Sequence, residues 1–178
     1  MWLTEVKAKA KRKNQIFFSK DSLLLDGLRQ LVEQTNRRAL VLWTLELAEE
    51  TAVQLEAKYP DHRPGEAVEA AHAWAKGEIK MPIAKRAILN CHAMAKELND
   101  QADIARCHAV GQACSTVHTV GHALGYPMYE LTAIVLESGL DACRDAVQQR
   151  VAHYTERLLY WRGREPNHPG SWANFLRK

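Results

Sequence analysis

Four cysteine and histidine side chains have spacings that would place them along one side of a helix. They are Cys107, Cys114, His118 and His122, at offsets of 0, 7, 11 and 15 residues. On a continuous helix these offsets fall on one stripe. Thiolates and imidazoles bind zinc or iron, and Cys91 or His92 would complete such a ligand shell. Because cysteine and histidine are also ordinary residues of helical cores, we expect packing here, and neither a metal nor a cofactor.

The dipeptide His-Ala recurs four times, at His72, His92, His108 and His122. The intervals of 20, 16 and 14 residues are too uneven for a repeat architecture. Each copy is consistent with a close-packing point where two helices cross. Alternatively, several of these imidazoles converge in one pocket and form a ligand-binding site.

Two other residues have both a functional and a structural interpretation. Glu78 follows Gly77 in a turn, where it could act as a general base toward a histidine, although helix capping near Pro82 or pairing with Lys80 is the ordinary role. Trp74 could anchor a protein interface, yet tryptophan at such a helical position usually packs in the core. The candidates for ligand or partner binding are Trp74, Glu78, His92, His118 and His122.

Recognisable catalytic motifs are missing from the sequence. It contains no Ser-His-Asp order, no phosphate loop, no HExxH motif and no paired carboxylates. We therefore assign no catalytic residue and expect a binding protein rather than an enzyme.

Charge is distributed unevenly along the 178 residues. Residues 1–13 carry +4 and residues 162–178 carry +3, so the middle of the chain must carry −4 to give the net charge of +3. We expect a basic, solvated arm over residues 1–15 and an irregular tail over residues 163–178, in which Trp172 and Phe175 fold back onto the body. The acidic middle makes nucleic acid an unexpected partner.

The cysteine pattern and the hydropathy favour a cytoplasmic protein. The four cysteines show no CxxC spacing, and no secretory signal peptide precedes them, so we expect reduced thiols. Residues 107–129 lack Asp, Glu, Lys and Arg, but this stretch contains three histidines and three glycines. Such polar groups are costly in lipid, so we expect a buried helix and no membrane contact.

Helical periodicity dominates the chain and predicts an all-α, single-domain bundle of about seven helices over residues 1–178. The expected helices cover about residues 21–36, 37–59, 64–76, 82–98, 101–121, 128–137 and 140–161. The fifth of these carries Ala102, Ala105, Ala109 and Ala113 beside Gly111. Small residues allow close approach, so this helix should be the buried centre of the bundle.

Two segments of the chain resemble a bacterial family of helical immunity proteins. These are AVEAAHAWAKGEIKM from Ala67 to Met81 and RCHAVGQACSTVHTVGHALGYPMY from Arg106 to Tyr129. The similarity extends over about residues 36–138 and includes Trp74, Gly77, Glu78, Met81, His118, His122, Gly125 and Tyr129.

The resemblance implies a small cytosolic protein that binds a partner toxin and neutralises it by protein-protein contact, and an acidic middle would suit a basic toxin. A metal- or small-ligand-binding protein or enzyme with a histidine-lined pocket is the alternative. A third interpretation is a structural helical module in which the histidines only pack.

Overall fold

The chain folds into eight α-helices and no strands, which confirms the predicted all-α single domain. The structure is a computed structural model that describes residues 1–178. The helices are α1 (Trp2–Lys11), α2 (Asp26–Glu33), α3 (Arg37–Lys58), α4 (Arg63–Lys76), α5 (Met81–Met94), α6 (Gln101–Ser115), α7 (Gly125–Ser138) and α8 (Arg144–Arg164). Short 3₁₀ turns occupy Leu23–Leu25, Ala95–Glu97, Val120–His122, Glu165–Asn167 and Asn174–Leu176.

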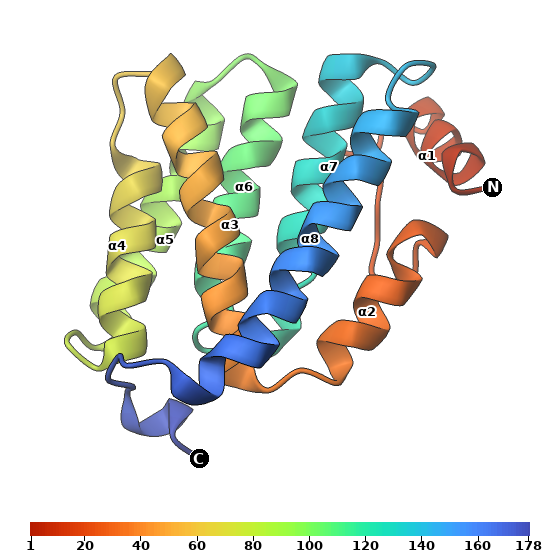
Figure 1. Cartoon of the computed structure of the whole chain (residues 1–178). Helices are drawn as coiled ribbons and strands as arrows, with labels where there is room; N and C mark the ends of the chain where they lie inside the picture. The colour runs from red at the N-terminus through yellow and green to blue at the C-terminus, as the bar shows by residue number, and fades with distance from the viewer.

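Helices α3 to α8 form the bundle, with α4 and α5 at one side and α7 and α8 at the other (Figure 1). Helix α6 packs against α3, α4, α5 and α7. Ala102, Ala105, Ala109 and Ala113 are all buried. The small-residue helix is therefore the centre of the bundle, as predicted.

Local signals fix where several helices begin and end. The Asn36 side chain accepts a hydrogen bond from the backbone N–H of Ala39 at 2.9 Å and caps α3. Asp100 caps α6 in the same way. Pro64 lies in the first turn of α4, where its missing N–H costs nothing, and Gly77 ends that helix with a φ of +82°.

Helix α6 ends at Ser115, six residues before the predicted end at residue 121. Beyond it, the backbone carbonyls of Val117 and His118 accept hydrogen bonds from the Arg37 guanidinium at 3.3 and 2.6 Å. Because a side chain of α3 satisfies these carbonyls, the chain can leave the helix without burying unpaired polar groups. The predicted single helix over 101–121 was wrong over its last six residues.

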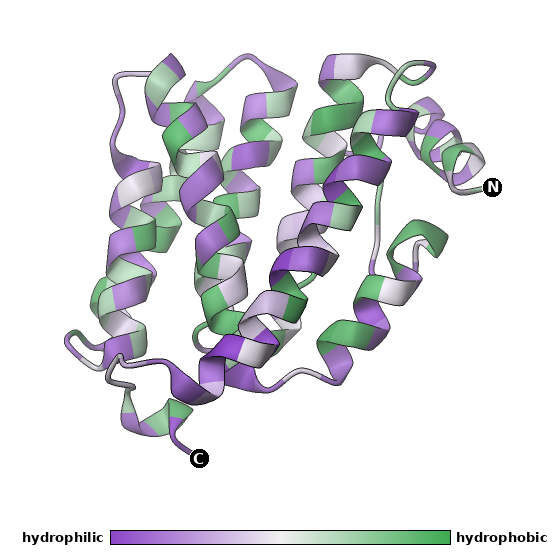
Figure 2. Cartoon of the chain, viewed as in Figure 1, coloured by the Kyte–Doolittle hydropathy of each residue, from purple (hydrophilic) through white to green (hydrophobic).

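The N-terminal end of the chain is more ordered than a solvated basic arm would be. Residues expected to form a solvated arm instead form α1, whose Trp2 and Val6 are buried. Trp2 packs against Phe18 with ring centroids 6.2 Å apart. At the other end, Trp172 and Phe175 pack against the core as expected. Figure 2 shows hydrophobic and hydrophilic residues sharing the circumference of most helices, as in an amphipathic bundle.

No helix in the structure has both the length and the apolar character that a membrane crossing demands.

Candidate functional site

Two of the predicted site residues stack on one another. Trp74, buried on α4, and His118, exposed after α6, have ring centroids 5.7 Å apart and an interplanar angle of 15°. Phe175 tilts against both rings. The Arg37 guanidinium carbon lies 5.3 Å from the centroid of the Phe175 ring. This aromatic cluster ties α4, the loop after α6 and the C-terminal segment together.

A cavity of about 640 Å³ opens beside this cluster and is lined by Trp74, His118, Phe175, Arg37, Met81 and neighbouring residues. Glu78 is exposed in the adjoining turn. Its side chain makes neither of the expected contacts, because it forms no hydrogen bond or ion pair in the structure. The structure thus brings Trp74 and His118 together but does not add Glu78 to them as a partner.

Two other histidines form a separate pair between α5 and α6. The Nδ1 atoms of His92 and His108 lie 2.8 Å apart, and the His108 ring packs 5.4 Å from that of Tyr129. Burial, together with the neighbouring His108 and His122, lowers the pKa of His92 to about 4. Burial also lowers the pKa of His108. Both imidazoles are therefore neutral at pH 7, which suits donation from one ring to the other.

Gly111 makes room for this pair. A Cβ atom at position 111 would overlap the His92 ring. His122 lies nearby, with its Nδ1 2.8 Å from the Gln112 side-chain oxygen. Three of the four His-Ala histidines thus gather around α6, whereas His72 lies on α4 and pairs with Glu49 at 2.6 Å.

The proposed cysteine-histidine stripe does not form, because it required one continuous helix. With α6 ending at Ser115, His118 turns toward Trp74 and His122 toward Gln112. Cys91, Cys107 and Cys114 are buried free thiols. Burial raises the pKa of each of them. No three His, Cys, Asp or Glu side chains are arranged to hold a metal ion.

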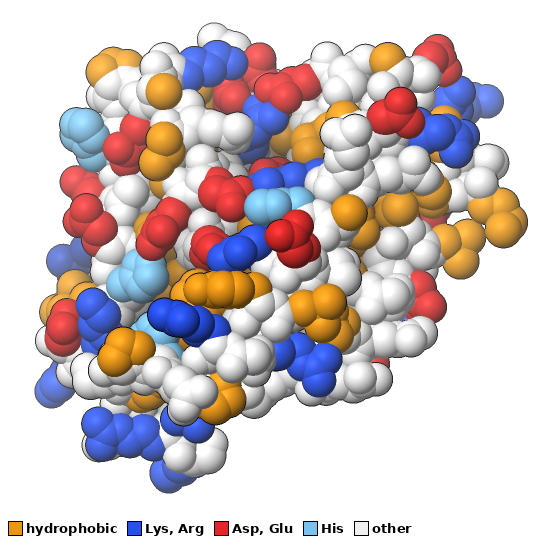
Figure 3. Space-filling view, in the orientation of Figure 1, with side chains coloured by type: hydrophobic (Ala, Val, Ile, Leu, Met, Phe, Trp, Pro, Cys, Tyr) orange, Lys and Arg blue, Asp and Glu red, His pale blue; other side chains and the backbone are white.

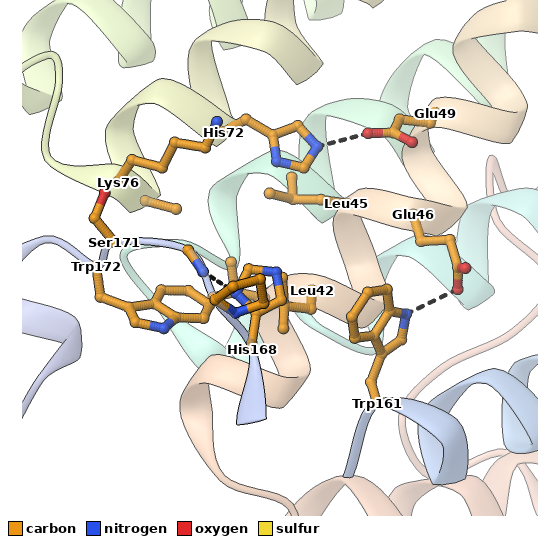
Figure 4. A pocket seen from close by; sticks show the side chains of 14 residues that line it. Leu42, Leu45, Glu46, Glu49, His72, Lys76, Trp161, His168, Ser171 and Trp172 are labelled. Carbon is orange, nitrogen blue, oxygen red and sulfur yellow. Dashed lines mark hydrogen bonds and ion pairs between the residues drawn. The ribbon is translucent and has the colours of Figure 1, made fainter. Parts of the chain in front are cut away.

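A second cavity, of about 510 Å³, lies between α3, α4, α8 and the C-terminal segment (Figure 4). We call it the tryptophan cavity. Trp161 and Trp172 lie on either side of His168, whose ring is 6.2 Å from the first and 5.6 Å from the second. Leu42 and Leu45 of α3 also line it.

Polar contacts fix the position of several side chains of the tryptophan cavity. The Trp161 indole N–H donates to Glu46 at 2.9 Å, and Arg157 binds the same carboxylate through two nitrogen atoms. His72 and Glu49 pair at the opposite rim (Figure 4). The backbone N–H of Gly170 donates to Nδ1 of His168 at 3.2 Å.

These residues lie outside the candidates predicted from the sequence. Trp161, His168 and Trp172 fall at the end of α8 and in a Pro- and Gly-containing segment that the sequence predicts to be an irregular tail. The sequence pattern that could have indicated this site is a histidine flanked by two tryptophans within twelve residues. The hydrogen bond from Trp161 to Glu46 joins residues 115 positions apart in the chain.

A buried polar network between α7 and α8 was also missed. Glu130 is 4% exposed and accepts hydrogen bonds from Arg150 at 2.9 Å and from the Tyr154 hydroxyl. Burial, followed by the Glu130 charge, raises the pKa of Tyr126 and of Tyr154. Arg150 also contacts Glu50 of α3, so the network joins three helices and is a structural element.

Comparison with known proteins gives one match. No curated protein and no solved structure is significantly similar to the chain. A sequence model of one family, described as "Imm-5 like putative immunity protein", matches residues 30–157. This range contains α3 to α7 and most of α8, including Trp74, Glu78, His92, His118 and His122. The chain therefore belongs to the Imm-5 like putative immunity protein family.

Proposed function

We propose that this protein is a cytoplasmic immunity protein that binds a partner toxin and neutralises it by protein-protein contact. Membership of the immunity family over residues 30–157 is the observation that carries the proposal. The sequence lacks a recognisable catalytic motif, which agrees with action by binding. The four buried, unpaired cysteines suit a reducing compartment.

The face formed by α3 and α4 is the surface on which we place the toxin. Glu49, Glu66 and Glu69 are exposed on these helices, and none of them pairs with a lysine or arginine. Glu46, also on α3, differs from these residues because Arg157 neutralises it. Figure 3 shows acidic side chains gathered over α3 and α4.

Exposed carboxylates that no lysine or arginine neutralises create a negative potential on this face, which attracts a basic partner and speeds association. We therefore propose that the toxin presents a basic surface to α3 and α4. The tryptophan cavity lies at one end of this face and adds an apolar recess to it. A charged rim around a recess of this kind is typical of a specific interface.

The test is expression of the gene adjacent to this one, alone and together with this protein. We expect growth arrest in the first case, rescue in the second, and a complex that elutes as one species. Glu49→Lys with Glu69→Lys should weaken the complex, mainly through slower association. Glu33→Lys on α2, outside this face, is the matched control and should leave binding unchanged.

An adjacent gene product that is neither toxic nor bound by this protein would remove the basis of the proposal. Rescue that persists unchanged in the double charge-reversal variant would instead show that the toxin binds another face.

A further inference from the structure

The tryptophan cavity has a composition that points to one kind of ligand. Its volume of about 510 Å³ lies in the range of small-ligand pockets. Leu42 and Leu45 of α3 line it together with the rings of Trp161, His168 and Trp172 (Figure 4). Such walls favour a ligand that has an apolar portion and a group attracted to aromatic faces.

The aromatic side chains of the cavity are held in place before any ligand arrives. The Trp161 ring is held by its N–H bond to Glu46, and the His168 ring by the backbone N–H of Gly170. Trp172 is held through Ala173, whose backbone N–H donates to the Ala75 carbonyl of α4 at 2.7 Å. Preorganised rings lose little conformational freedom on binding.

The carboxylates of the cavity define the charge of that ligand. Glu46 is already neutralised by Arg157. The Glu49 side chain at the rim is 55% exposed, and its single partner is His72. Glu49 can therefore accept hydrogen bonds from an incoming cation. The faces of tryptophan rings attract the same cation, and most strongly a planar guanidinium.

We infer that the tryptophan cavity receives an arginine side chain from the surface of the partner, with its methylene stem against Leu42 and Leu45 and its guanidinium between the tryptophan rings and Glu49. This inference rests on the proposed function, because it names the group by which the basic partner is recognised. Residues 161–172 lie outside the matched range 30–157, while α3 and α4 lie within it. The C-terminal segment would thus contribute to partner specificity.

Lys76 provides an internal test, because it lines the same cavity with the charge of the proposed ligand. Removing the Lys76 charge should strengthen the binding of a cation in the cavity and weaken the binding of an anion. Lys76 is exposed and forms no ion pair, so Lys76→Gln should leave the fold intact.

The first experiment uses this chain alone and blocked amino acids as probes. N-acetylarginine amide is titrated while the indole N–H signals of Trp161 and Trp172 are followed by NMR, beside the lysine, norleucine and glutamate derivatives. We expect saturable shifts with arginine, weaker shifts with lysine, and none with norleucine or glutamate. Glu49→Gln should weaken arginine binding at least threefold, Lys76→Gln should strengthen it, and Glu66→Gln outside the cavity should not change it.

Equal shifts with arginine and norleucine, or no shift with either, would overturn the inference. A glutamate derivative that binds better than arginine would assign the cavity to an anion instead. If the toxin complex is available, Trp172→Ala should lower its affinity at least tenfold, while unchanged affinity would contradict the inference. Failure of the adjacent gene product to bind would overturn the proposed function but leave the result with the blocked arginine unaffected.

Discussion

The imidazoles of His92 and His108 face each other across the contact of α5 with α6, with their Nδ1 atoms 2.8 Å apart. One ring must donate the hydrogen and the other must accept it, so this contact requires at least one neutral imidazole. The lowered pKa of both groups satisfies that requirement at pH 7.

Stability should therefore fall on acidification. The pKa of His92 is about 4 in the folded state, against an ordinary value near 6.5. Between about pH 6.5 and about pH 4 the unfolded chain binds a proton at His92 that the folded chain does not bind. The free energy of unfolding therefore decreases as the pH is lowered through this range. We expect a loss of about 2 kcal/mol from this group, since solvent screens part of the half-buried ring.

Urea unfolding of the wild type and of His92→Gln at about pH 7 and about pH 4.5 measures this effect. The variant should show a shallower dependence of stability on pH, whereas His62→Gln, which removes a histidine from the surface, should behave like the wild type. Identical slopes for His92→Gln and the wild type would contradict the assignment.

Gly111→Ala should destabilise the protein because its methyl group would overlap the His92 ring. Overpacking of this kind costs about 1–3 kcal/mol. His92→Ala in the same chain should relieve the overlap, so the double variant should lose less stability than the sum of the single variants. Gly163→Ala on α8, where no atom lies within 4 Å of the added Cβ, should raise the free energy of unfolding by up to about 1 kcal/mol. Strictly additive losses at positions 92 and 111 would show that the two residues do not touch.

Glu130→Ala should be among the most damaging single changes, because it leaves the Arg150 charge without one of its two carboxylates in a buried setting. Breaking a buried ion pair from one side costs about 3–5 kcal/mol. Glu97→Gln removes a carboxylate from a solvent-exposed pair with Arg63 and should lower the free energy of unfolding much less. Chemical denaturation of both variants checks the contrast, and equal losses would show that the network around Glu130 is dispensable.

Arg37→Gln should loosen the loop between α6 and α7. The guanidinium donates to the carbonyls of Val117, His118 and Phe175, so its loss leaves several acceptors without their partner. We expect a loss of about 1–3 kcal/mol. Hydrogen exchange should become faster at the amides of Thr119, His122 and Ala123, which are hydrogen-bonded within this loop. Arg86→Gln, at an exposed position on α5, is the control, and unchanged exchange in the loop would contradict the role of Arg37.

Local sequence signals were sufficient to predict most helices. The predicted helix over 37–59 corresponds to α3 at Arg37–Lys58, and that over 64–76 to α4 at Arg63–Lys76. Asn36, Pro64 and Gly77 mark these boundaries through contacts within a few residues of chain. The central position of α6 also followed from its own small residues.

Features that depend on distant contacts could not be predicted in this way. The end of α6 is set by Arg37, which lies 80 residues before Val117. That early end separates His118 from His122, although both were placed on one helical stripe. His92 and His108 were recognised as candidate positions, but their pairing depends on the space left by Gly111 at the contact of α5 with α6. The tryptophan cavity needs α8 and the C-terminal segment to meet α3 and α4.

The docking of the C-terminal segment under α4 also determines how the protein should be tethered. Figure 1 places the C-terminus at the base of α4, whereas the N-terminus leaves α1 at the opposite side of the molecule. A tag or a solid support attached after Lys178 would crowd the entrance between Trp172 and α3, while the same attachment before Met1 would leave that entrance open. Fusions made at the two ends should therefore differ in their capacity to capture a partner, even though they fold equally well.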